Sequence, residues 1–201
     1  IDLKFLDIND ILLLRGDKAK HETAFVPTGH SFATELQEQV NRFNDGYFLD
    51  GSQMKVIDEP FSYGMACYPE KHEESPNMET ELYWAKKKVD NGAEYLVTQM
   101  FFDNRKYYDF VEKCREIGID VPIIPGLKPI TFMNQLTVLP RIFKSEIPEE
   151  FARELRKCKT DEAAAEVGVE WCTEQARDLI SHKVPSIHFY SLMATESVKR
   201  V

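Results

Sequence analysis

The chain of 201 residues is 43% hydrophobic and carries a formal net charge of −9, from 25 basic and 34 acidic residues. That length and apolar content suffice for a sizeable core in one domain or in part of a larger one. The basic residues are dispersed, apart from Lys86, Lys87 and Lys88, which argues against the basic face that a nucleic-acid partner requires. No apolar run reaches the roughly 20 residues that span a bilayer, and no signal-peptide pattern precedes the first predicted strand, so we expect a cytoplasmic protein without a membrane partner.

The four cysteines are widely spaced and lack the C-x-x-C pairing of zinc sites and redox dithiols. They are Cys67, Cys114, Cys158 and Cys172. The histidines show no metal-ligand spacing either. We therefore expect buried free thiols in a reducing cytosol and no metal site.

Apolar runs that indicate strands alternate with helical patterns along the chain. The strand candidates are residues 11–14, 63–67, 95–100, 122–124 and 186–190. Most lack polar alternation, which is typical of parallel strands covered on both faces. Between them, apolar residues recur at helical spacing over 107–117 and 164–179. This repeat predicts an α/β fold with a parallel sheet.

The two ends of the predicted strands differ in sequence. Gly92 and Gly118 stand where left-handed helix C-caps belong, shortly before the next strand, so these helix-to-strand turns are tight. The strand-to-helix loops instead carry polar side chains, and in a TIM barrel the active site lies at this carboxyl end of the strands. The polar connection 44–62 predicts a surface insertion on the opposite side.

The number of units fits only part of such a barrel. About five βα units are visible, whereas a whole barrel has eight units and roughly 250 residues. We therefore expect a TIM (β/α)8 barrel of which residues 1–201 form about the last five units, the C-terminal part of one catalytic domain. At about 30 residues per unit, we expect roughly 100 residues before Ile1.

Three groups of polar residues follow predicted strands, and each has two interpretations. Asp17 of the Arg15-Gly16-Asp17 segment is either a functional carboxylate or part of a structural ion pair. Tyr68 and His72 flank a Pro-Glu turn, so both can point toward one ligand, although a lone loop histidine is more often structural. A buried amide at Gln99 needs hydrogen-bond partners, which are either a ligand or a neighbouring backbone.

The lysine run at 86–88 ends a predicted helix that carries Glu79 and Glu81 near its start. This arrangement satisfies the helix macrodipole by itself, which favours a solvated helix end. The alternative is a clamp on a ligand phosphate, for which an ammonium is suited as a point charge.

Six segments follow one another along nearly the whole chain: Leu12 to Asp17, Ala66 to His72, Lys88 to Ala93, Thr98 to Asp103, Ile123 to Gly126 and His188 to Tyr190. Together they closely resemble the methylenetetrahydrofolate reductase family. The resemblance implies a TIM-barrel flavoenzyme that takes hydride from NADH or NADPH onto noncovalent FAD. The resemblance further implies that the enzyme passes this hydride to a small-molecule folate substrate, 5,10-methylenetetrahydrofolate. The product is 5-methyltetrahydrofolate, and the kinetics are ping-pong. We also expect a homo-oligomer.

The resemblance also assigns residues. The family's FAD contacts correspond to Arg15, Gly16, Asp17, Phe32, Ala33, Tyr68, His72, Ser75, Glu81, Lys87 and Lys88. Its substrate contacts correspond to Asp17, Gln99 and Gln135, of which Asp17 and Gln99 are the expected catalytic residues. By this resemblance Asp17 favours the folate cation that accepts hydride. Gln99 serves the nicotinamide and the pterin in turn, because an amide both donates and accepts hydrogen bonds.

The chain also departs from the family pattern. The family's proton-donating glutamate lies on the first barrel strand, which we expect among the residues before Ile1. Trp84 stands where an FAD-contacting Asn is common, and Ala194 where the family has a substrate-binding Arg. Two alternative functions stay open: another FAD-binding barrel of the proline dehydrogenase kind, and a flavin-binding fragment without turnover.

Overall fold

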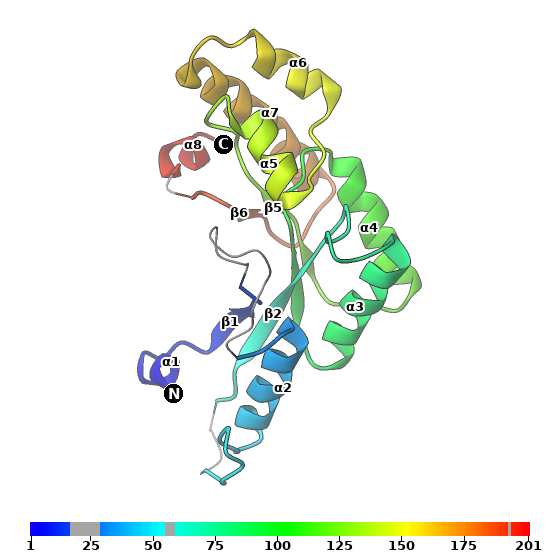
Figure 1. The fold of residues 1–201 in the computed structure, drawn as a ribbon, viewed down its shortest axis with the longest axis vertical. Coiled ribbons are helices and arrows are strands. Elements are labelled where there is room, and N and C mark those ends of the chain that lie inside the picture. The colour runs from blue at the N-terminus through cyan, green and yellow to red at the C-terminus, as the bar shows by residue number, and fades with distance from the viewer. Residues whose placement is uncertain (17–28, 55–58, 193) are drawn as a thin grey trace.

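The computed structural model describes residues 1–16, 29–54, 59–192 and 194–201 as an α/β structure (Figure 1). The strands are β1 (Asp10–Leu13), β2 (Ser62–Cys67), β3 (Tyr95–Thr98), β4 (Ile123–Ile124), β5 (Gly126–Leu127) and β6 (His188–Phe189). The helices are α1 (Asp2–Phe5), α2 (Ala33–Asn44), α3 (Met78–Asp90), α4 (Asn104–Glu116), α5 (Gln135–Phe143), α6 (Glu149–Lys157), α7 (Asp161–Ser181) and α8 (Thr195–Arg200).

Every strand pair in the described sheets is parallel. One sheet has the order β1-β2-β3-β4, and a second sheet pairs β5 with β6. The register sets Leu13 opposite Met65 and Cys67 opposite Thr98, so the carboxyl ends of β1, β2 and β3 lie side by side. Each predicted strand run overlaps a strand of the structure. The prediction of an α/β fold with a parallel sheet is therefore confirmed.

A proline separates the two sheets. Pro125 lies between β4 and β5, and it has no N–H to donate to a strand ladder. Its carbonyl accepts from the His188 N–H at 2.9 Å, which starts the pairing with β6. The predicted run 122–124 therefore continues into β5 after a break, whereas the run 95–100 is too long because β3 ends at Thr98.

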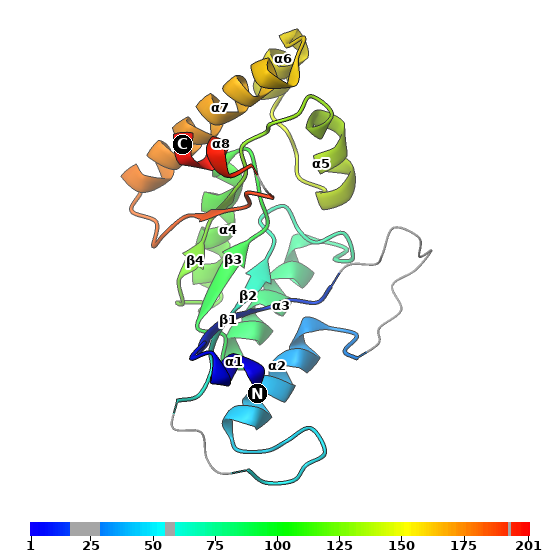
Figure 2. The same cartoon turned by 90° about the vertical axis from the view of Figure 1, so that its left-hand side faces the viewer.

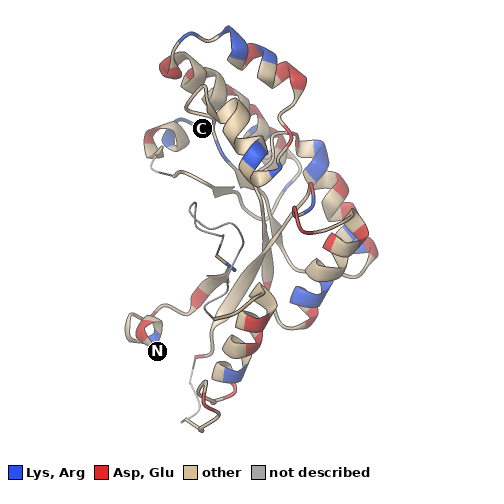
Figure 3. Ribbon diagram, viewed as in Figure 1, with Lys and Arg blue, Asp and Glu red and all other residues tan. Residues whose placement is uncertain are grey.

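The helices between strands cover one face of the curved sheet. In Figure 1, α2, α3 and α4 lie along the outer side of the strands. Figure 2, a quarter turn away, shows β1 to β4 in front of α3 and α4. Charged residues of both signs are interspersed along these helices, while the strands are mostly uncharged (Figure 3). No helix within the described residues is both long and apolar enough to cross a membrane.

Two clusters of buried apolar side chains hold the layers together. The larger one joins the strands to α3, α4 and α7 and includes Met65, Leu96 and Phe110, none more than 1% exposed. The smaller one packs Phe102, which follows β3, against Phe151 of α6. Most periodic apolar positions of the predicted helices therefore pack into these two clusters, whereas Ile117 is 39% exposed.

The cysteines are free thiols. Cys67, Cys114 and Cys172 are buried as predicted, but Cys158 is partly exposed, which corrects the prediction for that residue. Burial raises the pKa of Cys114 and of Cys172 to about 12. Both thiols therefore stay protonated near neutral pH.

Glycines end two helices as predicted. Gly92 and Gly118 have left-handed φ angles of 110° and 75°. After Gly92, the Ala93 N–H bonds back to the Lys88 carbonyl at 3.0 Å, the pattern of a Schellman cap. These tight turns occupy the amino ends of the strands and leave the longer loops to the carboxyl ends.

Tyr95 of β3 reaches across three strands. Its ring lies over Gly64 of β2, where an added Cβ would overlap the ring. Its hydroxyl donates to the Ile11 carbonyl of β1 at 3.1 Å. Tyr95 therefore adds a side-chain contact to β1, the strand that leads to Arg15, beyond the pairing of β1 with β2.

The connection from α2 to β2 approaches the amino ends of the strands. It includes a bridge between Tyr47 and Gln53. The Asn44 side chain bonds both the N–H and the carbonyl of Phe61, at 2.8 and 2.9 Å. The surface insertion over 44–62 stays a prediction.

Candidate active site

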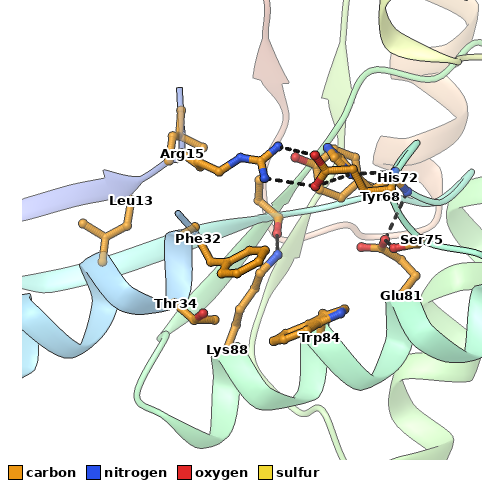
Figure 4. Close-up of a pocket in the computed structure, with 14 residues that line it drawn as sticks. Leu13, Arg15, Phe32, Thr34, Tyr68, His72, Ser75, Glu81, Trp84 and Lys88 are labelled. Carbon is orange, nitrogen blue, oxygen red and sulfur yellow. Dashed lines mark hydrogen bonds and ion pairs between the residues drawn. The ribbon is translucent and has the colours of Figure 1, made fainter. Parts of the chain in front are cut away.

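A cavity of about 330 Å³ lies where β1 and β2 end, between the start of α2 and one face of α3 (Figure 4). Its lining residues are Leu13, Leu14, Arg15, Phe32, Ala33, Thr34, Ala66, Tyr68, His72, Glu74, Ser75, Glu81, Trp84 and Lys88. The cavity therefore opens at the carboxyl ends of the strands, the end where the sequence predicts the site.

Arg15 and Glu74 form an ion pair along one side of the cavity (Figure 4). The two terminal guanidinium nitrogens donate to the two carboxylate oxygens, each at 3.0 Å. This is the bidentate geometry of strong arginine–carboxylate pairs. The hydrogen bond from Arg15 lowers the pKa of the Glu74 carboxyl. The Arg15 side chain is 20% exposed and that of Glu74 54%, so the arginine belongs to the wall and the glutamate to the rim.

The loop after β2 brings Tyr68 and His72 together, as the sequence predicts. Their rings meet edge to face with centroids 4.7 Å apart. Between them Lys71 adopts a left-handed backbone conformation with φ of 63°, which tightens the turn. His72 Nδ1 accepts from the Glu74 N–H at 3.2 Å. In the neutral ring, Nε2 is then the nitrogen that carries the proton.

Glu81 of α3 holds this loop from beneath. Its side chain is only 2% exposed. The Oε2 atom accepts from the His72 N–H at 3.0 Å and from the Ser75 hydroxyl at 2.8 Å. A buried carboxylate needs such donors, because an unpaired charge is costly in the interior. Glu81 therefore orders the loop that carries His72, Glu74 and Ser75.

The three consecutive lysines have different surroundings. Lys86 pairs with Asp90 one turn later, and the Lys87 ammonium lies 5.1 Å from the centre of the Trp84 ring. Only Lys88 lines the cavity, where its ammonium donates to the Ala66 carbonyl at 2.7 Å. Burial lowers the pKa of Lys88, and the negative charge of Glu81 opposes this effect.

Two aromatic rings form an apolar part of the cavity wall. Phe32, at the start of α2, and Trp84 of α3 lie with centroids 6.4 Å apart and planes 14° apart (Figure 4). Phe32 is 51% exposed, so its ring offers contact area to a ligand. Next to it, Ala33 and Thr34 belong to the first turn of α2, where backbone N–H groups lack intrahelical acceptors.

The structure gathers most of the predicted FAD contacts around one cavity. Those that line it are Arg15, Phe32, Ala33, Tyr68, His72, Ser75, Glu81 and Lys88. Gly16 follows Arg15 directly but is exposed, and Lys87 does not line the cavity, since its ammonium lies over Trp84. Asp17 lies outside the residues that the structure describes.

The predicted substrate contacts Gln99 and Gln135 are not part of this cavity. Gln99 follows the last residue of β3, and its N–H bonds the Cys67 carbonyl at 2.8 Å. It is half-buried, which corrects the prediction of a buried strand position. The Gln135 side-chain oxygen accepts from the N–H groups of Thr131 and Phe132, at 2.8 and 3.3 Å, and so caps the start of α5.

Several cavity residues escaped the sequence analysis: Leu13, Leu14, Thr34, Ala66 and Glu74. The apolar ones carry no chemical signal in a single sequence. Glu74 did carry one, because it lies two residues after His72 in a predicted strand-to-helix loop. Its partner Arg15 is 59 positions away, a pairing that no local pattern indicates.

The residue types around the cavity fit the diphosphate and ring systems of FAD. Arg15 and Lys88 supply cations from β1 and α3, and arginine and lysine are the usual phosphate-binding side chains. Phe32 and Trp84 supply flat apolar surface. The volume of about 330 Å³ is at the small end of the ~300–1,000 Å³ range for ligand pockets. Within the described residues, no cluster of His, Cys, Asp or Glu is suited to hold a metal ion.

The fold and the cavity define an α/β protein of parallel βα units, with a pocket lined by cationic and aromatic side chains at the carboxyl ends of its strands. Residues 2–201 match the family model described as methylenetetrahydrofolate reductase. The chain belongs to this family.

Curated relatives agree with this assignment. The chain is 36% identical over 204 residues to a probable methylenetetrahydrofolate reductase (NADPH) of Caenorhabditis elegans, which covers 98% of this chain and 28% of that protein. It is 32% identical over 200 residues to methylenetetrahydrofolate reductase (NADH) 1 of Arabidopsis thaliana, covering 94% and 32%. It is 34% identical over 137 residues to 5,10-methylenetetrahydrofolate reductase of Escherichia coli, covering 68% and 46%. The chain thus spans about a third of the length of the first two relatives.

Proposed function

We propose that the protein takes part in the FAD-dependent reduction of 5,10-methylenetetrahydrofolate to 5-methyltetrahydrofolate with NADH or NADPH, by ping-pong kinetics. The observation that carries this proposal is the convergence of Arg15, Lys88 and Phe32, from three separate elements, on one cavity. Family membership supports it. The proposal includes a (β/α)8 barrel to which these βα units belong, and a cytoplasmic homo-oligomer.

In this proposal the described cavity holds the cofactor. When bound, FAD carries hydride from the nicotinamide to the folate. Lys88 and Arg15 neutralise its diphosphate, and an anion beside Lys88 offsets the burial that lowers the pKa of this lysine. Phe32 and Trp84 provide stacking surface. Tyr68 and His72 provide polar contacts from the loop that Glu81 orders.

The substrate contacts are assigned to the neighbouring strand ends. Gln99 follows β3 in the same position in which Tyr68 follows β2, since Cys67 and Thr98 are paired in register. From there its amide is proposed to orient both substrates in turn. Asp17 is proposed to favour the cationic folate through its negative charge. The amide nitrogen of Gln135 is the group proposed to contact folate, because its oxygen already caps α5.

The experiment is a pair of anaerobic half-reactions on the purified protein. Bound FAD should show its absorbance, lose it on addition of NADH or NADPH, and regain it on addition of 5,10-methylenetetrahydrofolate. Bleaching by proline would instead favour the proline dehydrogenase alternative. FAD that binds but is not bleached by either nicotinamide would favour the fragment without turnover. A protein that binds no FAD contradicts the proposal.

Asp17→Asn and Gln99→Leu separate the two proposed roles. Asp17→Asn should slow the folate half-reaction more than flavin reduction, because only the folate step develops a cation. Gln99→Leu should slow both. Equal losses in both half-reactions for Asp17→Asn would exclude the role given to this aspartate.

A further inference from the structure

Glu74 is paired with Arg15, the arginine that is proposed to bind the diphosphate of FAD. Its two carboxylate oxygens take both terminal nitrogens of Arg15 at 3.0 Å. A phosphate binds a guanidinium through the same parallel pair of N–H groups. The Glu74 carboxylate and a ligand phosphate therefore compete for the same N–H groups of the Arg15 guanidinium.

The glutamate is the partner that can move. Its side chain is 54% exposed at the rim, whereas that of Arg15 is 20% exposed in the wall. The loop on both sides of Glu74 is fixed, because buried Glu81 accepts from the His72 N–H and from the Ser75 hydroxyl. A rotation of the Glu74 side chain therefore breaks these two hydrogen bonds to Arg15 without unfolding the loop.

We propose that Glu74 is an internal competitor for the diphosphate at Arg15 and thereby sets the affinity of the cavity for FAD. This inference rests on the proposed function. A bound diphosphate replaces the carboxylate at Arg15 and meets repulsion if the carboxylate stays nearby, since like charges disfavour binding. Binding of the diphosphate loses the free energy of the ion pair between Arg15 and Glu74. Only a ligand that also contacts Lys88 and the two aromatic rings of the cavity offsets this loss. Glu74 thus lowers the affinity for FAD and for a small anion by the same factor, and only a ligand with further contacts still binds tightly.

The test compares Glu74→Gln with the parent protein in titrations of FAD and of inorganic pyrophosphate. The amide keeps the shape of the side chain but removes its charge. We expect about 3- to 10-fold tighter binding of both probes, the scale of a partly exposed ion pair. Thermal unfolding of the variant checks that the fold is retained, and Glu74→Ala provides a second removal of the charge.

Two controls locate the effect. Glu73→Gln removes the same charge from the same loop, but Glu73 faces Lys144 at 3.6 Å outside the cavity, so neither affinity should change. When Arg15 is already replaced by Gln, the further change Glu74→Gln should not increase the affinity for FAD or for pyrophosphate. A gain in either control, or weaker FAD binding by Glu74→Gln, would overturn the inference.

The two probes distinguish the inference from the proposed function. If the parent protein binds no FAD but Glu74→Gln binds pyrophosphate more tightly, the proposed function fails and the competition at Arg15 stands. If FAD binds the parent and Glu74→Gln equally well, the competition is refuted and the proposed function stands.

Discussion

The carboxyl ends of the strands form two differently organised halves. Over β1 and β2, long-range contacts gather the predicted cofactor residues, as in the Arg15–Glu74 pair across 59 positions. Over β3 and β5, Gln99 and Gln135 make short-range or backbone bonds and share no cavity with those residues. The half proposed to hold the cofactor is thus fixed by long-range contacts of the protein itself, whereas none of the contacts described for Gln99 and Gln135 joins these two residues.

The largest effect should come from Glu81, which orders the cofactor half. Glu81→Ala leaves the His72 N–H and the Ser75 hydroxyl without their buried acceptor. We expect a loss of about 2 to 3 kcal/mol in the free energy of unfolding, since hydrogen bonds to charged groups contribute this much. Denaturant titration measures it, and Glu79→Ala, at an exposed position of the same helix, is the control. Equal losses of stability in Glu81→Ala and Glu79→Ala would contradict the proposed role of Glu81 in ordering the loop.

The second effect separates two neighbouring lysines. Lys88→Met should weaken FAD binding by about 10- to 100-fold and Lys87→Met by about 3-fold or less, because only Lys88 lines the cavity. Changing both to Ala should weaken FAD retention more than either single change, and the part due to the more exposed Lys87 should be largest at low salt, because salt screens exposed charges. Equal losses from the two single variants would argue against this distinction, and unchanged FAD affinity in the double variant would exclude both ammonium groups from FAD binding.

The third effect concerns a contact that joins the two halves. Glu70, on the loop after β2, accepts from the Glu146 N–H at 3.0 Å, in the segment after α5. Burial raises the pKa of Glu70 from 4.5 to about 7. Between these two values the folded protein binds more protons than the unfolded chain, so this carboxyl makes the protein less stable as pH rises through that window.

Glu70→Gln tests this dependence. At about pH 8 the variant should be more stable than the parent by roughly 1 to 3 kcal/mol, given about 1.4 kcal/mol per pKa unit. The difference should shrink toward about pH 4, where the carboxyl is protonated in both states. Denaturant titrations at several pH values provide the measurement. A difference that does not change with pH would show that the titration of Glu70 is not involved.

The smallest effect tests whether Gln135 has a role beyond its cap. Gln135→Ala should cost about 1 kcal/mol of stability, as the loss of a helix cap does. Gln135→Glu keeps an oxygen for the Thr131 and Phe132 N–H groups, so stability should be retained while folate affinity falls. Unchanged folate affinity in Gln135→Glu would leave this residue with a structural role alone.

The sequence predicted the elements better than their contacts. Uninterrupted apolar runs mark β1, β2 and β3 because buried parallel strands need no polar alternation. Gly92 and Gly118 mark helix ends because their φ angles are positive. The break at Pro125 follows from its missing N–H, yet the pairing of β5 with β6 depends on residues about 60 positions apart, which a local pattern does not reveal.

The candidate site shows the same division. The family resemblance indicated Arg15, Tyr68 and His72 by residue type. It set Lys87 and Lys88 apart from Lys86 but not from each other, because the directions of Lys88 toward the Ala66 carbonyl and of Lys87 toward the Trp84 ring arise only once α3 is packed against β2. Glu74 was missed for a related reason, since its partner is supplied by another strand.

The packing of Tyr95 over Gly64 limits how this sheet can vary among related proteins. The ring fills the space that any side chain at position 64 would need, and its hydroxyl reaches the Ile11 carbonyl of β1. A larger residue at 64 is compatible with the fold only if position 95 becomes smaller, so the two positions should change together in an alignment of homologues. A relative that loses the tyrosine also loses the tie to β1 and must hold the start of its cofactor loop by other means.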